Sequence, residues 1–311
     1  MRIAVFGAGS VGGYFGGRLA QAGEEVIFIA RNQNLRAMQA NGLRVDSIKG
    51  NFLIKPVKAT DDPYQVKQVD FVLIGVRAWQ VPEIAPMILP MVGKETGVIF
   101  LGNGVEAPVQ LIPVLGAEHV LGGLCRISVF LAGPGHIRHA GIEPFIAFGE
   151  LDRNLSPRVE NLQQSFERAG VKVNVPDDIW AAIWEKFVFI ASISGVGAVT
   201  RAPAGVIRRV PETRQMLENA VEEVVNLARA RNIDLPEDIH VKTMRFIDGM
   251  TPGVIASMQR DIVEGRPSEL EAQSGAVVHM GIESGVPTPI HTFIYGSLLP
   301  QELKARGELS Y

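Results

Sequence analysis

A glycine-rich turn near the N-terminus constrains the fold of this chain more than any other feature. The apolar run "RIAVF" is followed by a GxGxxG pattern, made by Gly7, Ala8, Gly9, Ser10, Val11 and Gly12. Residues 11–21 then have the apolar spacing of a helix, and a second strand is expected to start near Glu25. A strand, a tight glycine turn, a helix and a second strand form a dinucleotide-binding unit. The alternative, a tight turn without a ligand, fits this context less well.

Each glycine of the turn has a separate expected role. Gly7 permits the tight turn, and Gly9 leaves room for a pyrophosphate to approach the backbone. Gly12, helped by Gly16, allows the helix to pack closely on the sheet. The unpaired N–H groups at the helix N-terminus are suited to bind phosphate.

The end of the second expected strand indicates which dinucleotide binds. Sites for NAD place an acidic residue there, about 20 residues after the glycine turn, to hold the ribose 2′-hydroxyl. This chain reads "FIARNQN", and Ala30, Arg31 and Asn32 occupy that place. An arginine can pair with a 2′-phosphate, so Arg31 favours NADP. The alternative is a solvated loop arginine.

The pattern of apolar runs divides the chain into two halves. "RIAVFG", "EEVIFIA", "DFVLIGV" and "TGVIFLG" predict strands of a parallel sheet with crossover helices, and 120–130, 135–140, 143–150 and 171–175 predict further strands. A helix is expected over 156–169. From about residue 177 the periodicity is helical, over 178–196, 211–232, 236–250, 254–264 and 267–284, with a short helix at the end. We therefore expect an α/β nucleotide-binding domain over 1–176 and an all-helical domain over 177–311.

Composition excludes several classes of protein. The 311 residues are 47% hydrophobic and 20% charged, with a net charge of −3 and scattered basic residues, so nucleic acid is not an expected partner. No run of about 18 uninterrupted apolar residues predicts a membrane helix. A single cysteine, Cys125, excludes an internal disulfide, and no Cys/His cluster predicts a metal site. The expected location is the cytoplasm.

One lysine is out of keeping with its surroundings. In "IWEKFVFIASISG", Lys186 stands between Trp184 and Phe187 in a segment that is otherwise apolar. Burying a charge without a partner is costly, so the lysine either extends its ammonium group to water or serves a chemical purpose.

Seven segments together resemble the ketopantoate reductase (2-dehydropantoate 2-reductase) family. They are the glycine turn, "FIAR", "VRAWQ", "LGNGVEAP", "PGHIRHAG", "WEKF" and "SMQRDIVEGRPSELE". The resemblance spans nearly the whole chain. It implies a Rossmann-type domain followed by a helical domain, with NADPH and substrate in the cleft between them. It also implies reduction of a 2-keto acid to a 2-hydroxy acid, which for ketopantoate is a step of pantothenate biosynthesis.

The resemblance also implies roles for particular residues. Lys186 matches the catalytic lysine, which protonates the developing alkoxide. Asn103 matches an asparagine that contacts cofactor and substrate, and Ser257 matches a serine that binds the substrate carboxylate. Glu269 matches a glutamate that helps to bind the cofactor and hydrogen-bonds the substrate hydroxyl. From the residues alone, Asn103 also suits a turn, and Glu269 also suits a helix start after Pro267.

The chain departs from the family pattern at four positions. Arg77 stands where a lysine is usual near the cofactor, and Ile190, Ser194 and Ser274 stand where asparagines are common. Lys186, Ile190 and Ser194 share one helix face because they are spaced by four residues. A more apolar substrate face leaves open, beside ketopantoate reduction, a D-2-hydroxyacid dehydrogenase acting on a more apolar 2-keto acid. A further alternative, of a different class, is a non-catalytic NADP-binding regulator. A homodimer is possible.

Overall fold

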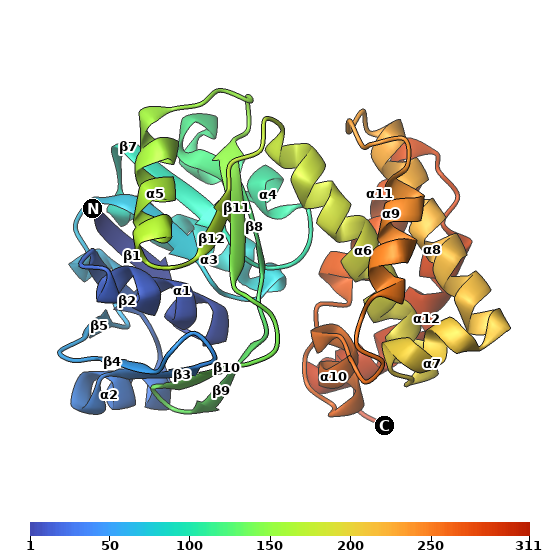
Figure 1. The fold of residues 1–311 in the computed structure, drawn as a ribbon, viewed down its shortest axis with the longest axis horizontal. Helices are drawn as coiled ribbons and strands as arrows, with labels where there is room; N and C mark the ends of the chain where they lie inside the picture. Colours follow the sequence, from blue (N-terminus) through green and yellow to red (C-terminus); the bar gives the residue numbers. More distant parts are fainter. The chain divides into compact units, whose positions relative to one another are not determined.

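The computed structural model describes residues 1–311 as two compact units (Figure 1). One unit comprises residues 1–102 and 107–179, and the other comprises residues 103–106 and 180–311. The short segment Asn103–Glu106 therefore belongs to the helical unit, although strands and helices of the α/β unit flank it in sequence. The fold class expected from the sequence, an α/β nucleotide-binding part followed by a helical part, is confirmed.

The α/β unit is built on an eight-stranded sheet with the order β12-β11-β8-β7-β6-β1-β2-β5. The strands are β1 (Arg2–Phe6), β2 (Glu25–Ile29), β5 (Lys58–Thr60), β6 (Val69–Ile74), β7 (Val92–Phe100), β8 (Val120–Arg126), β11 (Phe145–Glu150) and β12 (Lys172–Asn174). Central strand β1 is parallel to both neighbours, with Val5 opposite Phe28 and Leu73. Its residues Ile3 to Val5 are fully buried, as expected for a strand covered on both faces.

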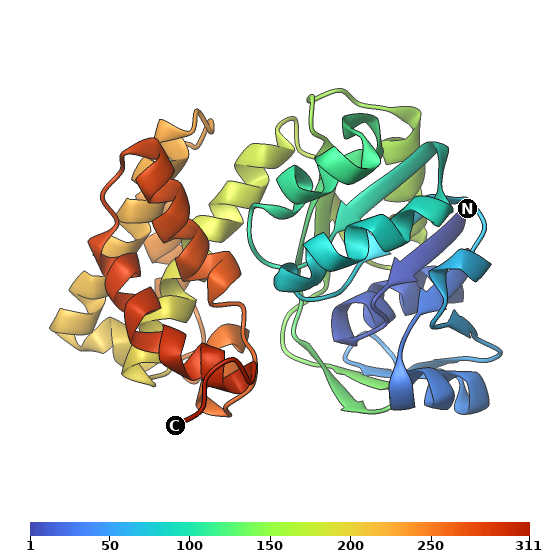
Figure 2. The same ribbon diagram turned by 180° about the vertical axis from the view of Figure 1, so that it is seen from behind.

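Helices cover both faces of this sheet. Figures 1 and 2 show α1 (Ser10–Gln21) and α5 (Pro157–Arg168) on one face, and α3 (Val81–Ile88) and α4 (Ala107–Leu115) on the other. Helix α2 (Asn32–Asn41) follows β2, and short 3₁₀ turns lie at Pro63–Gln65, Ala78–Gln80, Leu89–Met91 and Ala117–His119. Helix α5 begins where the sequence predicts, because the Ser156 side chain accepts a hydrogen bond from the Val159 N–H.

The sheet is less regular than the apolar runs predict. Strand β11 is antiparallel to β8, so the sheet is parallel only over the six strands from β8 to β5. The four strands expected to be parallel, β1, β2, β6 and β7, are among these six. The expected strand over 120–130 is in fact two strands in different sheets. A second, four-stranded sheet has the order β4 (Phe52–Ile54), β3 (Leu43–Ser47), β10 (His136–His139) and β9 (Val129–Gly133). It packs on α1, where Ile137 contacts Gly13.

The second unit is helical throughout. It contains α6 (Ile179–Thr200), α7 (Ala204–Arg209), α8 (Pro211–Ala230), α9 (Ile239–Asp248), α10 (Ser257–Val263), the π-helical turn η5 (Glu271–Gly275), α11 (Ala276–Ser284) and α12 (Pro289–Ala305). Five of these agree with the helical segments expected from periodicity. Helix α7 was not expected, and α12 has 17 residues where only a short helix was predicted.

Helix α6 is the first helix of this unit and carries Lys186. By length and composition it could cross a membrane, since it has 22 residues and a mean hydropathy of 1.5, but 67% of the relevant window is buried inside the protein. A core helix has the same composition. Close packing explains its glycines: a Cβ atom at Gly195 would lie 3.1 Å from both Ile294 and the Ser274 hydroxyl, and one at Gly197 would lie 2.5 Å from Gln259.

Candidate functional site

The glycine turn connects β1 to α1 in a conformation that side chains would disrupt. Gly7 has a φ of +94°, and a Cβ atom there would lie 2.5 Å from Val76. A Cβ atom at Gly12 would lie 2.3 Å from the carbonyl oxygen of Gly7. Gly9 differs, since a Cβ atom there would meet nothing within 4 Å. The turn is therefore packed tightly on the protein side and open at Gly9, as a cradle for a dinucleotide requires.

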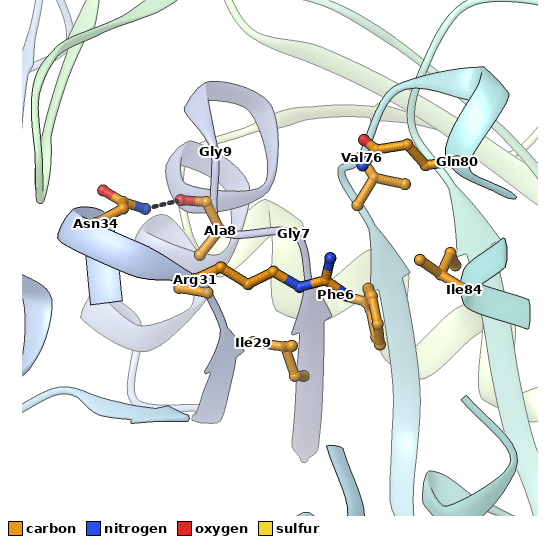
Figure 3. A pocket seen from close by; sticks show the side chains of 11 residues that line it. Phe6, Gly7, Ala8, Gly9, Ile29, Arg31, Asn34, Val76, Gln80 and Ile84 are labelled. Carbon is orange, nitrogen blue, oxygen red and sulfur yellow. Dashed lines mark hydrogen bonds between the residues drawn. The ribbon is translucent and has the colours of Figure 1, made fainter. Parts of the chain in front are cut away.

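A pocket opens beside this turn (Figure 3). Its lining residues are Phe6, Gly7, Ala8, Gly9, Ile29, Ala30, Arg31, Asn34, Val76, Gln80 and Ile84. Figure 3 shows the Arg31 side chain running past the glycine turn toward Phe6. Arg31 is the only charged residue of the lining, so no carboxylate repels a 2′-phosphate.

Asn34 was not identified from the sequence, although it lies in the "RNQN" segment. Its Nδ2 donates to the carbonyl oxygen of Ala8 at 2.8 Å, and its Oδ1 accepts from the Gly135 N–H at 2.8 Å. The side chain thereby ties helix α2 to the glycine turn and to the β9–β10 turn. The only signal in the sequence that could have indicated this role was an asparagine near the start of an expected helix.

The remaining cofactor candidates of the α/β unit are not among the residues that line the pocket. Ser10 and Val11 begin α1, where the first N–H groups of the helix are located. Arg77 follows β6 and is not part of the pocket lining. Its guanidinium lies 5.8 Å from the ring centroid of Trp79, and its backbone N–H donates to Oε1 of Gln80 at 3.1 Å.

In the helical unit, α6 presents its candidates with different exposure. Lys186 is half-buried on α6. The neighbouring residues Trp184 and Phe187 are buried, and their rings meet each other edge to face at a centroid distance of 5.6 Å. Ile190, one turn later, is also half-buried, whereas Ser194 is fully buried and its hydroxyl has no hydrogen-bond partner. The substrate face expected at Lys186, Ile190 and Ser194 is thus accessible only over its first two residues.

Asn103 and Glu269 meet in the same unit. Nδ2 of Asn103 donates to Oε2 of Glu269 at 2.8 Å, and the Glu269 side chain is 3% exposed. The segment start after Pro267 is stabilised instead by Glu302, which accepts from the backbone N–H and the hydroxyl of Ser268. This argues against a helix-capping role for Glu269. Ser257 is exposed as the first residue of α10.

The loop that carries Asn103 also places a carboxyl group in unfavourable surroundings. Burial raises the pKa of Glu106, and the nearby carboxylate of Glu271 raises it further. Glu271 in turn accepts from the hydroxyl of Tyr295 at 2.7 Å and lies 3.3 Å from Nδ1 of His279. Burial, followed by this hydrogen bond, raises the pKa of Tyr295 to about 12, so the phenol remains a hydrogen-bond donor at neutral pH.

Comparison with known proteins extends this description to the whole chain. Residues 3–153 match the family model "Ketopantoate reductase PanE/ApbA", and residues 178–302 match its C-terminal companion. A PanE/ApbA family ketopantoate reductase from Ralstonia eutropha JMP134 is 31% identical, with a TM-score of 0.90, over 98% of this chain and 100% of that chain. A 2-dehydropantoate 2-reductase from Nostoc is 27% identical over 96% of this chain and 94% of its own. A D-mandelate dehydrogenase, solved with NADH and anilino(oxo)acetate, shares the fold at 22% identity and a TM-score of 0.88, covering 98% of this chain and 99% of that chain.

The fold, the glycine turn and these matches define the class of protein as a dinucleotide-binding oxidoreductase that acts on a CH–OH group. Within that class, the chain belongs to the ketopantoate reductase PanE/ApbA family. The resemblance inferred from the sequence motifs is confirmed.

Proposed function

We propose that this protein reduces a 2-keto acid to a 2-hydroxy acid with NADPH, and that the substrate is 2-dehydropantoate (ketopantoate). The observation that carries the proposal is the hydrogen bond between Asn103 and the buried carboxylate of Glu269, in the unit where Lys186 is half-buried on α6. These residues match the family motifs, and the carboxylate is held by a side chain rather than used as a helix cap. The relatives named 2-dehydropantoate 2-reductase support the substrate.

The cofactor assignment rests on the pocket beside the glycine turn. NADPH, when bound, supplies the reducing equivalent. The N–H groups at the start of α1 would bind its pyrophosphate, and the open space over Gly9 would admit it. Arg31 would pair with the 2′-phosphate, and Arg77 and Asn103 would contribute further contacts. The part proposed for residues 1–176 is NADP binding.

The chemistry proposed for residues 177–311 is proton donation and substrate positioning. A carbonyl group that is reduced develops negative charge on its oxygen, which a positioned ammonium group stabilises and protonates. Lys186 would supply this proton. Glu269 would accept a hydrogen bond from the substrate hydroxyl, and Ser257 would bind the carboxylate.

A second candidate is a D-2-hydroxyacid dehydrogenase that acts on a more apolar 2-keto acid. The observation that favours it is the apolar character of the accessible face of α6, because Ile190 offers no hydrogen bond and the hydroxyl of Ser194 is buried. A D-mandelate dehydrogenase with the same fold fits this alternative. For either function we propose a cytoplasmic location and a homodimer.

The decisive experiment is NADPH oxidation with a panel of 2-keto acids that includes ketopantoate and acids with apolar far ends. We expect turnover of ketopantoate, and a Lys186→Ala variant should lower kcat by about 10²–10⁴-fold while NADPH still binds. Lys242→Ala is a matched control, because Lys242 is exposed on α9 and pairs with Asp238, the residue that precedes this helix. Faster turnover of an apolar acid would favour the second candidate. Tight NADPH binding without turnover of any acid would indicate a regulator.

A further inference from the structure

Gln273, in the π-helical turn η5, is a fully buried amide that uses only part of its hydrogen-bonding capacity. Its Nε2 donates to Oε2 of Glu269 at 3.4 Å, whereas its Oε1 has no partner. A buried carbonyl oxygen without a donor costs about 1–3 kcal/mol, and an apolar side chain of similar size avoids that cost. The amide at this position therefore needs an explanation other than packing.

The backbone of η5 brings Gln273 to the side chain of Glu269. The Gly275 N–H donates to the carbonyl oxygen of Leu270 at 2.9 Å, which closes the wide π turn, and the Gln273 N–H donates to the carbonyl oxygen of Glu269 at 3.1 Å. Side chains four residues apart lie on the same side of such a turn. Turns of this kind are frequent at functional sites, where they aim particular side chains.

The two amide donors act on the same carboxylate oxygen. Asn103 Nδ2 lies 2.8 Å from Oε2 of Glu269, and Gln273 Nε2 lies 3.4 Å from that same atom. Neither donor bonds to Oε1 of Glu269. The last torsion of a glutamate side chain is otherwise broad, so two donors on one oxygen define the plane of the carboxylate. Oε1 then remains as the acceptor that Glu269 can offer to a ligand.

We propose that Gln273 is a positioning residue, which holds the Glu269 carboxylate so that Oε1 faces the hydroxyl group of the substrate. This inference rests on the proposed function, which gives Glu269 its contact with the substrate. The 3.4 Å distance is long for an N–H···O bond. Hydrogen bonds in unliganded sites are often long and shorten when the ligand binds. The unpaired Oε1 of Gln273 lowers stability, and this loss accompanies the placement of an N–H donor beside Glu269.

The first test is Gln273→Leu, which keeps the size of the side chain and removes its donor. We expect kcat/KM for the preferred 2-keto acid to fall about tenfold or more, while the NADPH Kd stays within about two-fold. The melting temperature should stay equal or rise, because an unpaired buried oxygen is removed. Gln259→Leu is the matched control: Gln259 is a buried amide of the same unit, and its Nε2 donates to the Ala202 carbonyl at 3.0 Å. It should lose melting temperature and retain kcat/KM.

The second test is Gln273→Glu, which places another carboxylate beside Oε2 of Glu269. An ionised glutamate only accepts hydrogen bonds, so kcat/KM relative to wild type should be lowest at alkaline pH and should recover as the pH is lowered. If Gln273→Leu retained the kcat/KM of wild type, the positioning role would be overturned. It would also be overturned if the kcat/KM of Gln273→Glu relative to wild type did not change with pH.

Failure of the proposed function would be recognised separately. If wild type oxidised NADPH with none of the 2-keto acids, the proposed function would fail irrespective of Gln273. The role of Gln273 would then be measured by calorimetry, as the affinity of the 2-keto acid analogue oxamate for the protein saturated with NADP⁺. Weaker binding by Gln273→Leu than by wild type supports the inference. Equal binding, or binding by neither protein, overturns it.

Discussion

Arg31 is the residue on which we propose that cofactor preference depends. It is exposed at the N-terminal end of α2, lines the pocket beside the glycine turn, and approaches the Met87 sulfur at 3.8 Å, a weak contact that a phosphate could replace. No other charged side chain lines that pocket. A guanidinium group in this place distinguishes a phosphate from a hydroxyl because it can form paired, charge-assisted hydrogen bonds only with the phosphate.

We therefore expect Arg31→Ala to weaken NADPH much more than NADH. The loss of a charge-assisted contact corresponds to about 1.5–3 kcal/mol, or about ten- to a hundred-fold in Kd. Fluorescence titration of both cofactors would measure it. Arg36→Ala is the matched control, since Arg36 is exposed on the same helix and lies outside the pocket lining. Equal wild-type affinity for the two cofactors would contradict the assignment.

At this scale the sequence was informative where a residue's chemistry was unusual for its surroundings. Lys186 could be singled out as a candidate because a lysine is rare in an apolar helix, and Asn103 and Glu269 because they lie in recognisable motifs. The burial of Ser194 was not predictable, because periodicity gives the face of a helix but not what packs on it. Gln273 was missed because its role depends on a π turn, which has no sequence signature comparable to an α-helix.

Among the secondary-structure elements, the connection from β1 to α1 matters most for function. Gly9 and Gly12 lie three residues apart and differ in what surrounds them. A side chain at Gly12 would meet the backbone, whereas Gly9 has an ordinary φ of −76° and open space over its Cα atom. The same substitution at the two positions therefore separates folding from ligand binding.

We expect Gly12→Ala to lower the free energy of unfolding by about 1–3 kcal/mol, because its Cβ would overlap the Gly7 carbonyl and Val5. Gly9→Ala should unfold at the wild-type temperature but bind NADPH at least about tenfold more weakly, since its methyl group would occupy space that the pyrophosphate needs. Thermal unfolding and NADPH titration of both variants would test this. Unchanged NADPH binding by Gly9→Ala would remove the support for a pyrophosphate at that place.

The elements themselves were predictable in proportion to their apolar periodicity. The long strands β1, β2, β6 and β7 and the helices α1, α5 and α8 agree with the sequence, since each has a continuous buried run or stripe. Strands β4 and β5 were missed because they have only three residues each, and β3, which is as long as β1 and β2, was missed because it is partly exposed and has no continuous buried run. The break between β8 and β9 was missed because "RIS" interrupts the apolar run only slightly.

At the scale of the whole molecule, the order of the chain does not fully define the two units. The expected boundary at residue 176 treats the molecule as two consecutive segments. The loop Asn103–Glu106 instead packs in the helical unit, where a Cβ atom at Gly104 would lie 3.1 Å from the Ala272 carbonyl. Such a long-range contact cannot be inferred from periodicity, although it is what places Asn103 on Glu269.

The stability of the molecule should also respond to pH through one histidine of the helical unit. His291 is completely buried, and its Nε2 lies 3.2 Å from the Ala220 carbonyl, so that nitrogen carries the hydrogen of a neutral ring. Its Nδ1 has no partner. The pKa of His291 is lowered from 6.5 to about 4. Burial lowers this pKa, and its effect outweighs that of the hydrogen bond to Ala220, which raises it. The folded protein therefore keeps this ring neutral in a range where the unfolded chain protonates it.

Between pH 6.5 and about 4 the unfolded state binds more protons at this position, so stability rises with pH and falls on acidification. The contribution of His291 is about 1.4 kcal/mol per pH unit within that window. We expect the melting temperature of the helical unit, measured by calorimetry from pH 8 to pH 4.5, to fall less steeply in His291→Gln than in wild type. Glutamine keeps a donor for the Ala220 carbonyl but does not titrate. The difference in melting temperature between the two proteins at pH 8 corrects for altered packing. If the melting temperature depended on pH with the same slope in both, this histidine would not be the group that responds.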